Sequence, residues 1–339
     1  MEEIVKTLGR EDAPPFLKVR LSFPHRLNCF IRLWCFKIVA YIVFAIHRYW
    51  YPSPPSLRPT LVKRYPSRPG LQVRIFYPPN HSSQNLLPLY LDIHGGGFAL
   101  CDPDIDDEFC AMWARRTGCL VASLDYSKAP LYPFPTAVYD VAALAEAVLA
   151  DESLPIDKTR VAMGGFSAGG NLALSASQLP GLKGTIKAAV PFYPVVNFDH
   201  PPDEKMRRCP YTGGPRDGLA DTSFWFDWAY LPPGQNRRNP LLSPCYAKRE
   251  NLPPWIYIIG AEWDLLRLEA QKMICELADV ELQEEDFEKG TYKWTLAKGC
   301  THGFTHHFGQ KPEKRKRREA KCEPILDQAV EWLGKALAG

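Results

Sequence analysis

The chain has 339 residues, 46% of them hydrophobic and 23% charged, which is ordinary for a globular protein with a sizeable core. Its formal net charge of +3 creates no overall field that would indicate nucleic acid as the partner. Ten cysteines are spread along the chain without a CxxC pair or a Cys/His cluster of zinc-ligand spacing, so we expect reduced thiols and no bound metal.

The most apolar stretch lies near the N-terminus, at residues 29–46. Arg32 and Lys37 interrupt it, so it is shorter than the roughly 20 uninterrupted apolar residues that indicate a transmembrane helix. His25, Asn28 and Arg32 recur at helical spacing, which favours an amphipathic helix. Three placements stay open: a helix packed in or over a substrate pocket, an anchor lying on a membrane surface, and a membrane-spanning anchor.

After a proline-rich connector, short apolar runs alternate with helix-forming segments. The runs are continuously apolar, as in strands buried on both faces of a sheet. This alternation predicts an α/β fold with a mostly parallel sheet and helices on both faces. Predicted strands cover residues 73–77, 87–93, 120–125, 160–164, 188–192 and 255–259, and predicted helices cover 107–116, 136–149, 169–178, 265–277 and 324–337. Residues 199–240 interrupt this alternation of strands and helices, and we interpret them as an inserted lid.

One predicted strand leads directly into Gly165-x-Ser167-x-Gly169, and a helix-forming run follows. This strand–turn–helix context is what a nucleophile elbow requires. Glycines flank the serine because the turn is too tight for side chains there. The start of the following helix favours developing negative charge beside the hydroxyl. We therefore predict that Ser167 is a catalytic nucleophile.

A glycine-rich segment, HGGGF at residues 94–98, follows an earlier predicted strand. Consecutive glycines let several backbone N–H groups point at one spot, as the stabilisation of an oxyanion requires. We predict Gly96 and Gly97 as donors, together with Ala168, the residue after the nucleophile. His94 is expected to hold this loop by hydrogen bonds rather than to act as a base.

A nucleophilic serine needs a base, and the base needs an orienting acid. Asp264 follows the end of a predicted strand and is our choice for the acid, with Glu262 as the local competitor. His302 lies beside a glycine on a later loop and is our choice for the base. His306 and His307 are expected at the start of the next helix, bonded to solvent or to structure.

These motifs, in this order, resemble those of the hormone-sensitive lipase-like (family IV) esterases. Besides HGGGF and GxSAGG, the chain carries Asp264-x-Leu-Arg, His302-Gly-Phe and Tyr126-x-x-Ala-Pro-x-x-x-Phe-Pro. The resemblance runs from about residue 71 to the C-terminus. It implies an α/β-hydrolase fold, the assignments made above, no metal or cofactor, and a helical cap.

The resemblance also suggests a division of the chain. Residues 1–60 would form an N-terminal segment that joins the cap or associates with a membrane, and residues 61–339 the α/β-hydrolase domain with a cap insertion at about 199–240. The family includes membrane-anchored deacetylases, so association with a membrane surface through residues 29–46 stays open. Residues 1–26 contain no apolar signal region, which favours an intracellular protein, either cytoplasmic or associated with the endoplasmic-reticulum membrane.

Several positions depart from the family pattern. Phe166 stands where relatives commonly carry an acid, and Leu131 replaces the usual acid after Ala-Pro. Phe166 and Phe98 predict an apolar pocket, and we place Trp225 and Phe304 at this pocket as well. The aromatic segment around Trp225 is either a helix facing the pocket or part of the cap core.

A dense basic run, residues 311–321, precedes the last predicted helix. We interpret it as a solvated surface loop, with a polyanion-binding or nuclear-localisation patch as the alternative.

The resemblance implies a serine carboxylesterase or deacetylase that hydrolyses an ester of a small, largely apolar molecule through an acyl-enzyme. One alternative keeps the nucleophile for amide hydrolysis, acyl transfer or cyclisation in secondary metabolism, since the Lys-Ala-Pro form of the Tyr126 motif looks like fungal members. The other alternative is a non-catalytic small-molecule receptor, which the presence of His302 disfavours. The motifs specify neither the acyl chain nor the oligomeric state.

Overall fold

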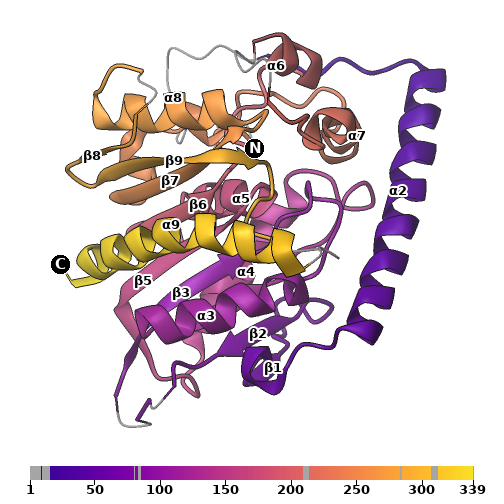
Figure 1. The fold of residues 1–339 in the computed structure, drawn as a ribbon. Coiled ribbons are helices and arrows are strands. Elements are labelled where there is room, and N and C mark those ends of the chain that lie inside the picture. Colours follow the sequence, from indigo (N-terminus) through magenta and orange to yellow (C-terminus); the bar gives the residue numbers. More distant parts are fainter. Residues whose placement is uncertain are drawn as a thin grey trace.

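The computed structural model describes residue 9 and residues 16–79, 81–82, 85–208, 214–282, 285–306 and 312–338. Within these ranges, nine strands form one sheet in the order β1-β2-β4-β3-β5-β6-β7-β9-β8 (Figure 1). The strands are β1 (Leu61–Lys63), β2 (Val73–Phe76), β3 (Leu87–Ile93), β4 (Leu120–Leu124), β5 (Ile156–Phe166), β6 (Ile186–Phe192), β7 (Trp255–Trp263), β8 (Phe287–Lys289) and β9 (Tyr292–Thr301). Neighbours from β4 to β9 pair in parallel, whereas β1, β2 and β8 pair antiparallel at the edges. The predicted α/β fold with a mostly parallel sheet is confirmed.

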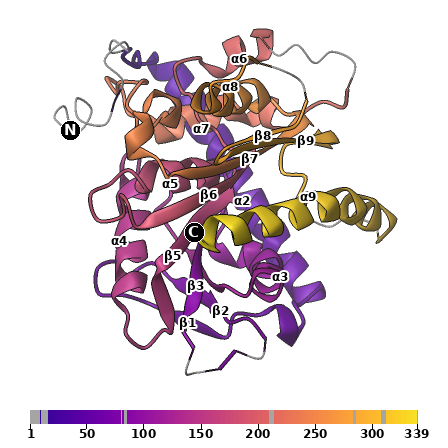
Figure 2. The same ribbon diagram turned by 90° about the vertical axis from the view of Figure 1, so that its left-hand side faces the viewer.

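Helices cover both faces of this sheet (Figure 2). One face carries α3 (Asp107–Thr117) and α9 (Pro312–Ala338), and the other carries α4 (Thr136–Ala150), α5 (Ala168–Ala176) and α8 (Arg267–Ala278). Side chains of a strand alternate between the two faces. In β3, Leu89 and Leu91 therefore join the core beneath α4 and α5, while Tyr90 joins the core beneath α3 and α9.

The carboxyl ends of the parallel strands meet at one edge of the sheet. Ser167 follows β5, Asp264 follows β7 and His302 follows β9. The crevice beyond the carboxyl ends of the strands is where open α/β sheets bind ligands. Three residues that lie far apart in the sequence therefore come to one place.

A long helix, α2 (Phe23–Trp50), runs along one side of the molecule and stands at the edge of Figure 1. It packs against α7 (Leu219–Tyr230), a helix of the 199–240 region that also contains the short α6 (Pro202–Arg208). Among the described residues, α2 is the helix that is long and apolar enough to cross a membrane, by length and composition, and 17% of its apolar window is buried. The inner side of α2 buries Cys29, Leu33 and Lys37.

The predicted loop at residues 311–321 is wrong for the part that the structure describes, because α9 already begins at Pro312. Lys, Arg, Glu and Ala are strong helix formers, and charged pairs hold the first turns. The Arg315 guanidinium bonds the Glu319 carboxylate one turn later at 2.7 Å and the Glu108 carboxylate of α3 at 2.6 Å. The basic run is therefore a helical surface.

The sequence reading missed three edge or near-edge strands. β1 and β8 have three residues each, and β9 carries Lys293 and Lys298 among its apolar residues. Such strands carry no continuous apolar run, because strands at or near a sheet edge keep one side in water.

Candidate active site

Ser167 joins the end of β5 to the start of α5 in a strained turn. Its backbone φ is +55°, in the left-handed region that side-chain-bearing residues rarely adopt. A Cβ added to Gly165 or to Gly169 would lie 2.2 Å or 1.9 Å from the backbone oxygen of Ile93. Both flanking positions therefore require glycine, which is the physical content of the GxSxG motif.

Three side chains form a continuous hydrogen-bonded chain at this turn. His302 Nε2 lies 2.8 Å from Ser167 Oγ, and His302 Nδ1 lies 2.8 Å from Asp264 Oδ2. The other oxygen of Asp264, Oδ1, accepts a hydrogen bond from the Leu266 N–H at 2.8 Å. Asp264 is buried and the imidazole is mostly so, which protects the chain of bonds from competing water. The geometry is that of a nucleophile, a base and an orienting acid.

The electrostatics of His302 suit a general base. Burial disfavours the imidazolium, but the charge and hydrogen bond of Asp264, together with the charge of Asp217, more than offset it and raise the pKa of His302 above its ordinary 6.5. A raised pKa makes the ring a better proton acceptor while leaving it neutral at sufficiently high pH.

The other acidic and imidazole residues considered from the sequence lie elsewhere. The Glu262 carboxylate accepts a hydrogen bond from the Gly299 N–H at 2.5 Å, on β9. His306 is partly buried in the loop after β9, where its Nε2 lies 2.6 Å from Asp106 Oδ1. It therefore does not lie at a helix start, although it is bonded to structure as expected. His307 lies outside the described residues.

The HGGGF loop is held firmly next to Ser167. Gly96 and Gly97 have φ of +114° and +60°, and a Cβ on Gly96 would lie 2.4 Å from the Leu100 backbone oxygen. His94 donates from Nδ1 to the Gly95 backbone oxygen at 2.7 Å and stacks on Tyr126. His94 thus holds the loop by a hydrogen bond and ring stacking, and does not belong to the Ser167–His302–Asp264 chain of bonds.

A sequence profile of the α/β-hydrolase fold matches residues 90–306, which is more than half of the chain and includes Ser167, Asp264 and His302. The chain belongs to the α/β-hydrolase fold family. Its resemblance to the hormone-sensitive lipase-like esterases within that family is confirmed, whereas the likeness to fungal members stays a prediction.

Curated relatives of this α/β-hydrolase include named esterases. The chain is 33% identical to an arylesterase of Saccharolobus solfataricus over 203 residues, which cover 58% of this chain and 63% of the relative. It is 30% identical to neutral cholesterol ester hydrolase 1 of Rattus norvegicus over 171 residues, which cover 47% of this chain and 41% of the relative. The chain thus spans less than two thirds of the length of either relative.

Solved structures of esterases share the fold over more of the chain. An esterase of Pyrobaculum calidifontis has a TM-score of 0.65 at 26% identity, covering 92% of this chain and 100% of its own. A thermostable carboxylesterase cloned from a metagenomic library has a TM-score of 0.64 at 27% identity, covering 79% of this chain and 85% of its own. The similarity therefore extends well beyond the motifs.

A small cavity of about 60 Å³ opens at Ser167 in this α/β-hydrolase. Phe98 lines it, stacked on the ring of Tyr230 with centroids 3.7 Å apart. Phe226 of α7 also lines it and crowds the HGGGF loop, because a Cβ on Gly97 would lie 2.6 Å from its ring. The space beside the nucleophile is apolar and narrow.

The other three predicted pocket residues are placed differently. Phe166 lines a second cavity of about 400 Å³, between α2, α3 and α9, together with Thr305 and His306. Trp225 packs against Phe36 of α2 with ring centroids 6.1 Å apart. Phe304 is buried against Tyr193 in the core beneath α9. Of the four predicted residues, Phe98 alone lines the described cavity at Ser167.

A buried polar cluster stands behind Phe166. His306 packs edge-on against the Phe166 ring with centroids 4.6 Å apart. Burial lowers the pKa of His306 to about 4 and raises the pKa values of Asp92 and Asp106 well above their usual range. No group of His, Cys, Asp and Glu suited to a metal ion occurs in the described ranges.

Sequence reasoning missed Asp217, which lies in the 199–240 insertion. Its Oδ2 accepts a hydrogen bond from the Leu265 N–H at 2.9 Å, next to Asp264, and its Oδ1 accepts one from the Leu219 N–H at 3.0 Å. Burial and the charge of Asp264 raise its pKa. The local sequence offers no motif that would have singled it out, because its position depends on how the insertion folds back.

Proposed function

We propose that this α/β-hydrolase is a serine carboxylesterase that hydrolyses an ester of a small, largely apolar molecule through an acyl-enzyme intermediate. The observation that carries the proposal is the hydrogen-bonded chain from Asp264 through His302 to Ser167, at a strained elbow beside a glycine-rich loop. The names of the arylesterase, the cholesterol ester hydrolase and the solved esterases support it.

Acylation begins when Ser167 Oγ attacks the ester carbonyl carbon while His302 Nε2 accepts the hydroxyl proton. The resulting oxyanion accepts hydrogen bonds from the N–H groups of Gly96, Gly97 and Ala168. Asp264 stabilises the imidazolium that forms on His302. The bond to the leaving alcohol then breaks, and His302 gives that alcohol its proton.

Deacylation repeats the same steps with water. His302 Nε2 accepts a proton from the water that attacks the acyl carbonyl, and the same donors hold the second oxyanion. The acyl–Oγ bond breaks, and His302 returns the proton to Ser167. The net reaction consumes one ester and one water and releases one acid and one alcohol. His302 accepts and returns the proton in every step of this scheme.

The pocket and cap narrow the substrate class. The cavity at Ser167 has a volume of about 60 Å³ and a mostly apolar lining, in which Phe98, Phe226 and aliphatic side chains outnumber polar residues such as Lys205 and Asp227, and this favours a short acyl group. We propose that α2 and the 199–240 insertion form the cap, because Phe36 of α2 packs on α7 and Phe226 of α7 lies over Gly97.

The test is labelling and hydrolysis by the purified chain. A fluorophosphonate probe should modify Ser167 once, and Ser167→Ala should abolish both labelling and the hydrolysis of p-nitrophenyl acetate, a loss of several orders of magnitude. A Ser167→Ala variant that keeps full activity would overturn the proposal. Product analysis in the presence of added alcohols or amines separates hydrolysis from acyl transfer, and a matched amide substrate tests amide cleavage.

A further inference from the structure

The outer side of α2 is the main exposed apolar surface of the described structure. Sixteen of the 23 large hydrophobic side chains exposed in the described ranges lie between Phe16 and Tyr51. Along the outward side of α2, six aliphatic side chains are each at least half exposed: Ile31, Ile38, Val39, Ile42, Val43 and Ile46. Single exposed hydrophobic residues are normal, but a continuous stripe marks an interaction surface. We call these six residues the α2 stripe.

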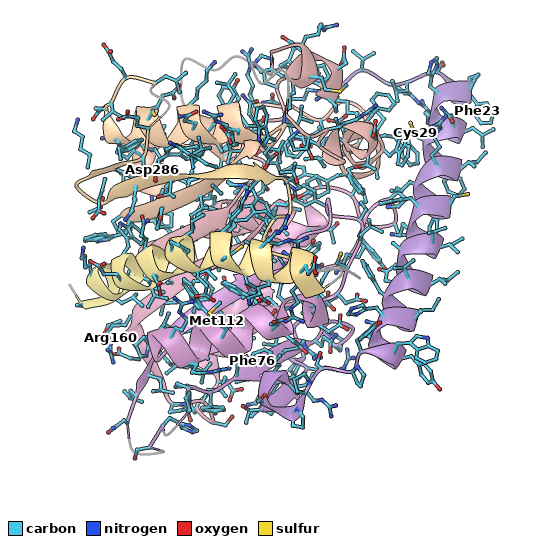
Figure 3. All side chains as sticks on the ribbon, viewed as in Figure 1. Phe23, Cys29, Phe76, Met112, Arg160 and Asp286 are labelled. Carbon is cyan, nitrogen blue, oxygen red and sulfur yellow. The ribbon has the colours of Figure 1, made fainter. Side chains whose placement is uncertain are left out.

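The lysine in the middle of α2 does not interrupt this stripe. Lys37, in the middle of the helix, points inward, and its Nζ donates to the backbone oxygens of Ala99 at 2.7 Å and Ala129 at 3.0 Å. Phe23, at the start of the helix, points away from the body, whereas Cys29 faces it (Figure 3). From Leu33 to Ile46 the outward side therefore carries no charge.

The stretch of sequence that contains α2 carries only basic ionised groups, five of which pair with carboxylates from elsewhere in the chain: Lys18, Arg48, Lys63, Arg68 and Arg74. Between Asp12 and Asp92 the sequence contains eleven Lys and Arg residues and no Asp or Glu. Arg20 and Arg32 are exposed toward one end of the helix, and Arg58 and Arg64 are exposed beyond the other end. A second copy facing this surface would bring like charges together, whereas a surface of anionic headgroups would complement them.

Aromatic side chains mark both ends of the stripe. Phe23 is 72% exposed before it, and Tyr49, Trp50 and Tyr51 are 69–80% exposed after it. Tyr and Trp are enriched at the boundary between headgroups and acyl chains, where an apolar ring and a polar tip are both accommodated. The helix is about 42 Å long at 1.5 Å per residue. When its axis lies parallel to a membrane surface, the aromatic residues at both of its ends can contact that surface.

We propose that the α2 stripe docks onto an anionic membrane surface, with the helix axis in the plane of the interface. In this orientation Lys37 keeps both of its hydrogen bonds, and the six aliphatic side chains enter the acyl boundary. A membrane-spanning α2 would break both bonds and carry the Lys37 charge into hydrocarbon, where polar groups lose their partners. The packing of Leu33 and Cys29 on the body would also be lost.

The test is co-sedimentation of the purified full chain with vesicles. The wild-type chain should pellet with mixed phosphatidylcholine–phosphatidylserine vesicles, and less with phosphatidylcholine alone or at high salt. The double variant Ile38→Asp/Ile42→Asp should lower the bound fraction by about tenfold or more, since both side chains would enter the acyl boundary. Leu282→Asp, which adds one charge at a half-exposed site outside α2, is the control and should bind as wild type.

Each other outcome counts against the proposal. It fails if the wild-type chain stays in the supernatant, or if the double variant binds as well as wild type. Resistance of the bound chain to alkaline carbonate would indicate a spanning helix instead. A dimer in size-exclusion chromatography that the double variant dissociates, without vesicle binding, would make a second copy the partner. Hydrolysis of a soluble short-chain ester by the double variant should match wild type, so this test is independent of the esterase proposal.

Discussion

The substitution Asp264→Asn tests the proposed role of His302 as the base, because Asp264 is the hydrogen-bond partner of His302 Nδ1. The two carboxylate oxygens are both used: Oδ1 accepts from the Leu266 N–H and Oδ2 faces His302 Nδ1, each at 2.8 Å. Asparagine keeps one acceptor oxygen and adds an NH₂ group. Because the backbone N–H of Leu266 can only donate, the oxygen stays there and the NH₂ turns to His302 Nδ1. The imidazole proton then moves to Nε2, which faces Ser167 as a donor and cannot accept the hydroxyl proton.

The expected loss in kcat/KM of Asp264→Asn is about 10⁴-fold, as for other enzymes in which the base is forced into the wrong tautomer, and corresponds to about 5.5 kcal/mol. Hydrolysis of p-nitrophenyl acetate measures it, with circular dichroism as the check on folding. Glu262→Gln is the matched control, because the Glu262 carboxylate bonds the Gly299 N–H rather than the imidazole. An Asp264→Asn variant within about tenfold of wild type, or an equal loss in Glu262→Gln, would refute the reasoning.

Three further predictions follow from the site and its cover. Catalysis needs neutral His302, so log(kcat/KM) should rise with pH and level off above the pKa of His302, which lies above 6.5. Asp217→Asn removes a nearby carboxylate and should therefore shift the rising part of this pH profile to lower pH. An unshifted profile would contradict the role given to Asp217. Phe226→Ala should open the space over Gly97 and raise the kcat/KM ratio of butyrate to acetate esters by about tenfold, whereas an unchanged ratio would show that the ring does not limit the acyl group. Leu33→Ala should lower the free energy of unfolding by about 2–5 kcal/mol in urea titration, because the side chain is fully buried between α2 and the body; a change below about 0.5 kcal/mol would mean that α2 is not packed there in solution.

Much of the fold and of the candidate site could be predicted from the sequence, because some backbone constraints depend only on a few neighbouring residues. Gly165 and Gly169 are needed by a turn that leaves no room for a Cβ, so a five-residue pattern carries the elbow. Continuous apolar runs marked the parallel strands, whose two covered faces require them. The same rule missed β9, whose lysines interrupt its apolar residues.

Other features depended on contacts between distant segments. Glu262 and Asp264 are two residues apart and chemically alike, and only the pairing of β7 with β9 directs one to Gly299 and the other to His302. The basic run after His306 looked like a loop because its charge suggested solvation, yet pairs with α3 and within α9 make it helical.

The N-terminal helix α2 shows most clearly which features the sequence determines and which depend on tertiary contacts. The sequence by itself determined that residues 29–46 form an apolar helix interrupted by two charges. Only the tertiary structure decided that Lys37 points inward to Ala99 and Ala129 and that the aliphatic stripe points outward. The reason is physical: helical periodicity places residues relative to one another on a helix, whereas the direction in which a face points is set by the acceptors and cavities that the rest of the chain supplies.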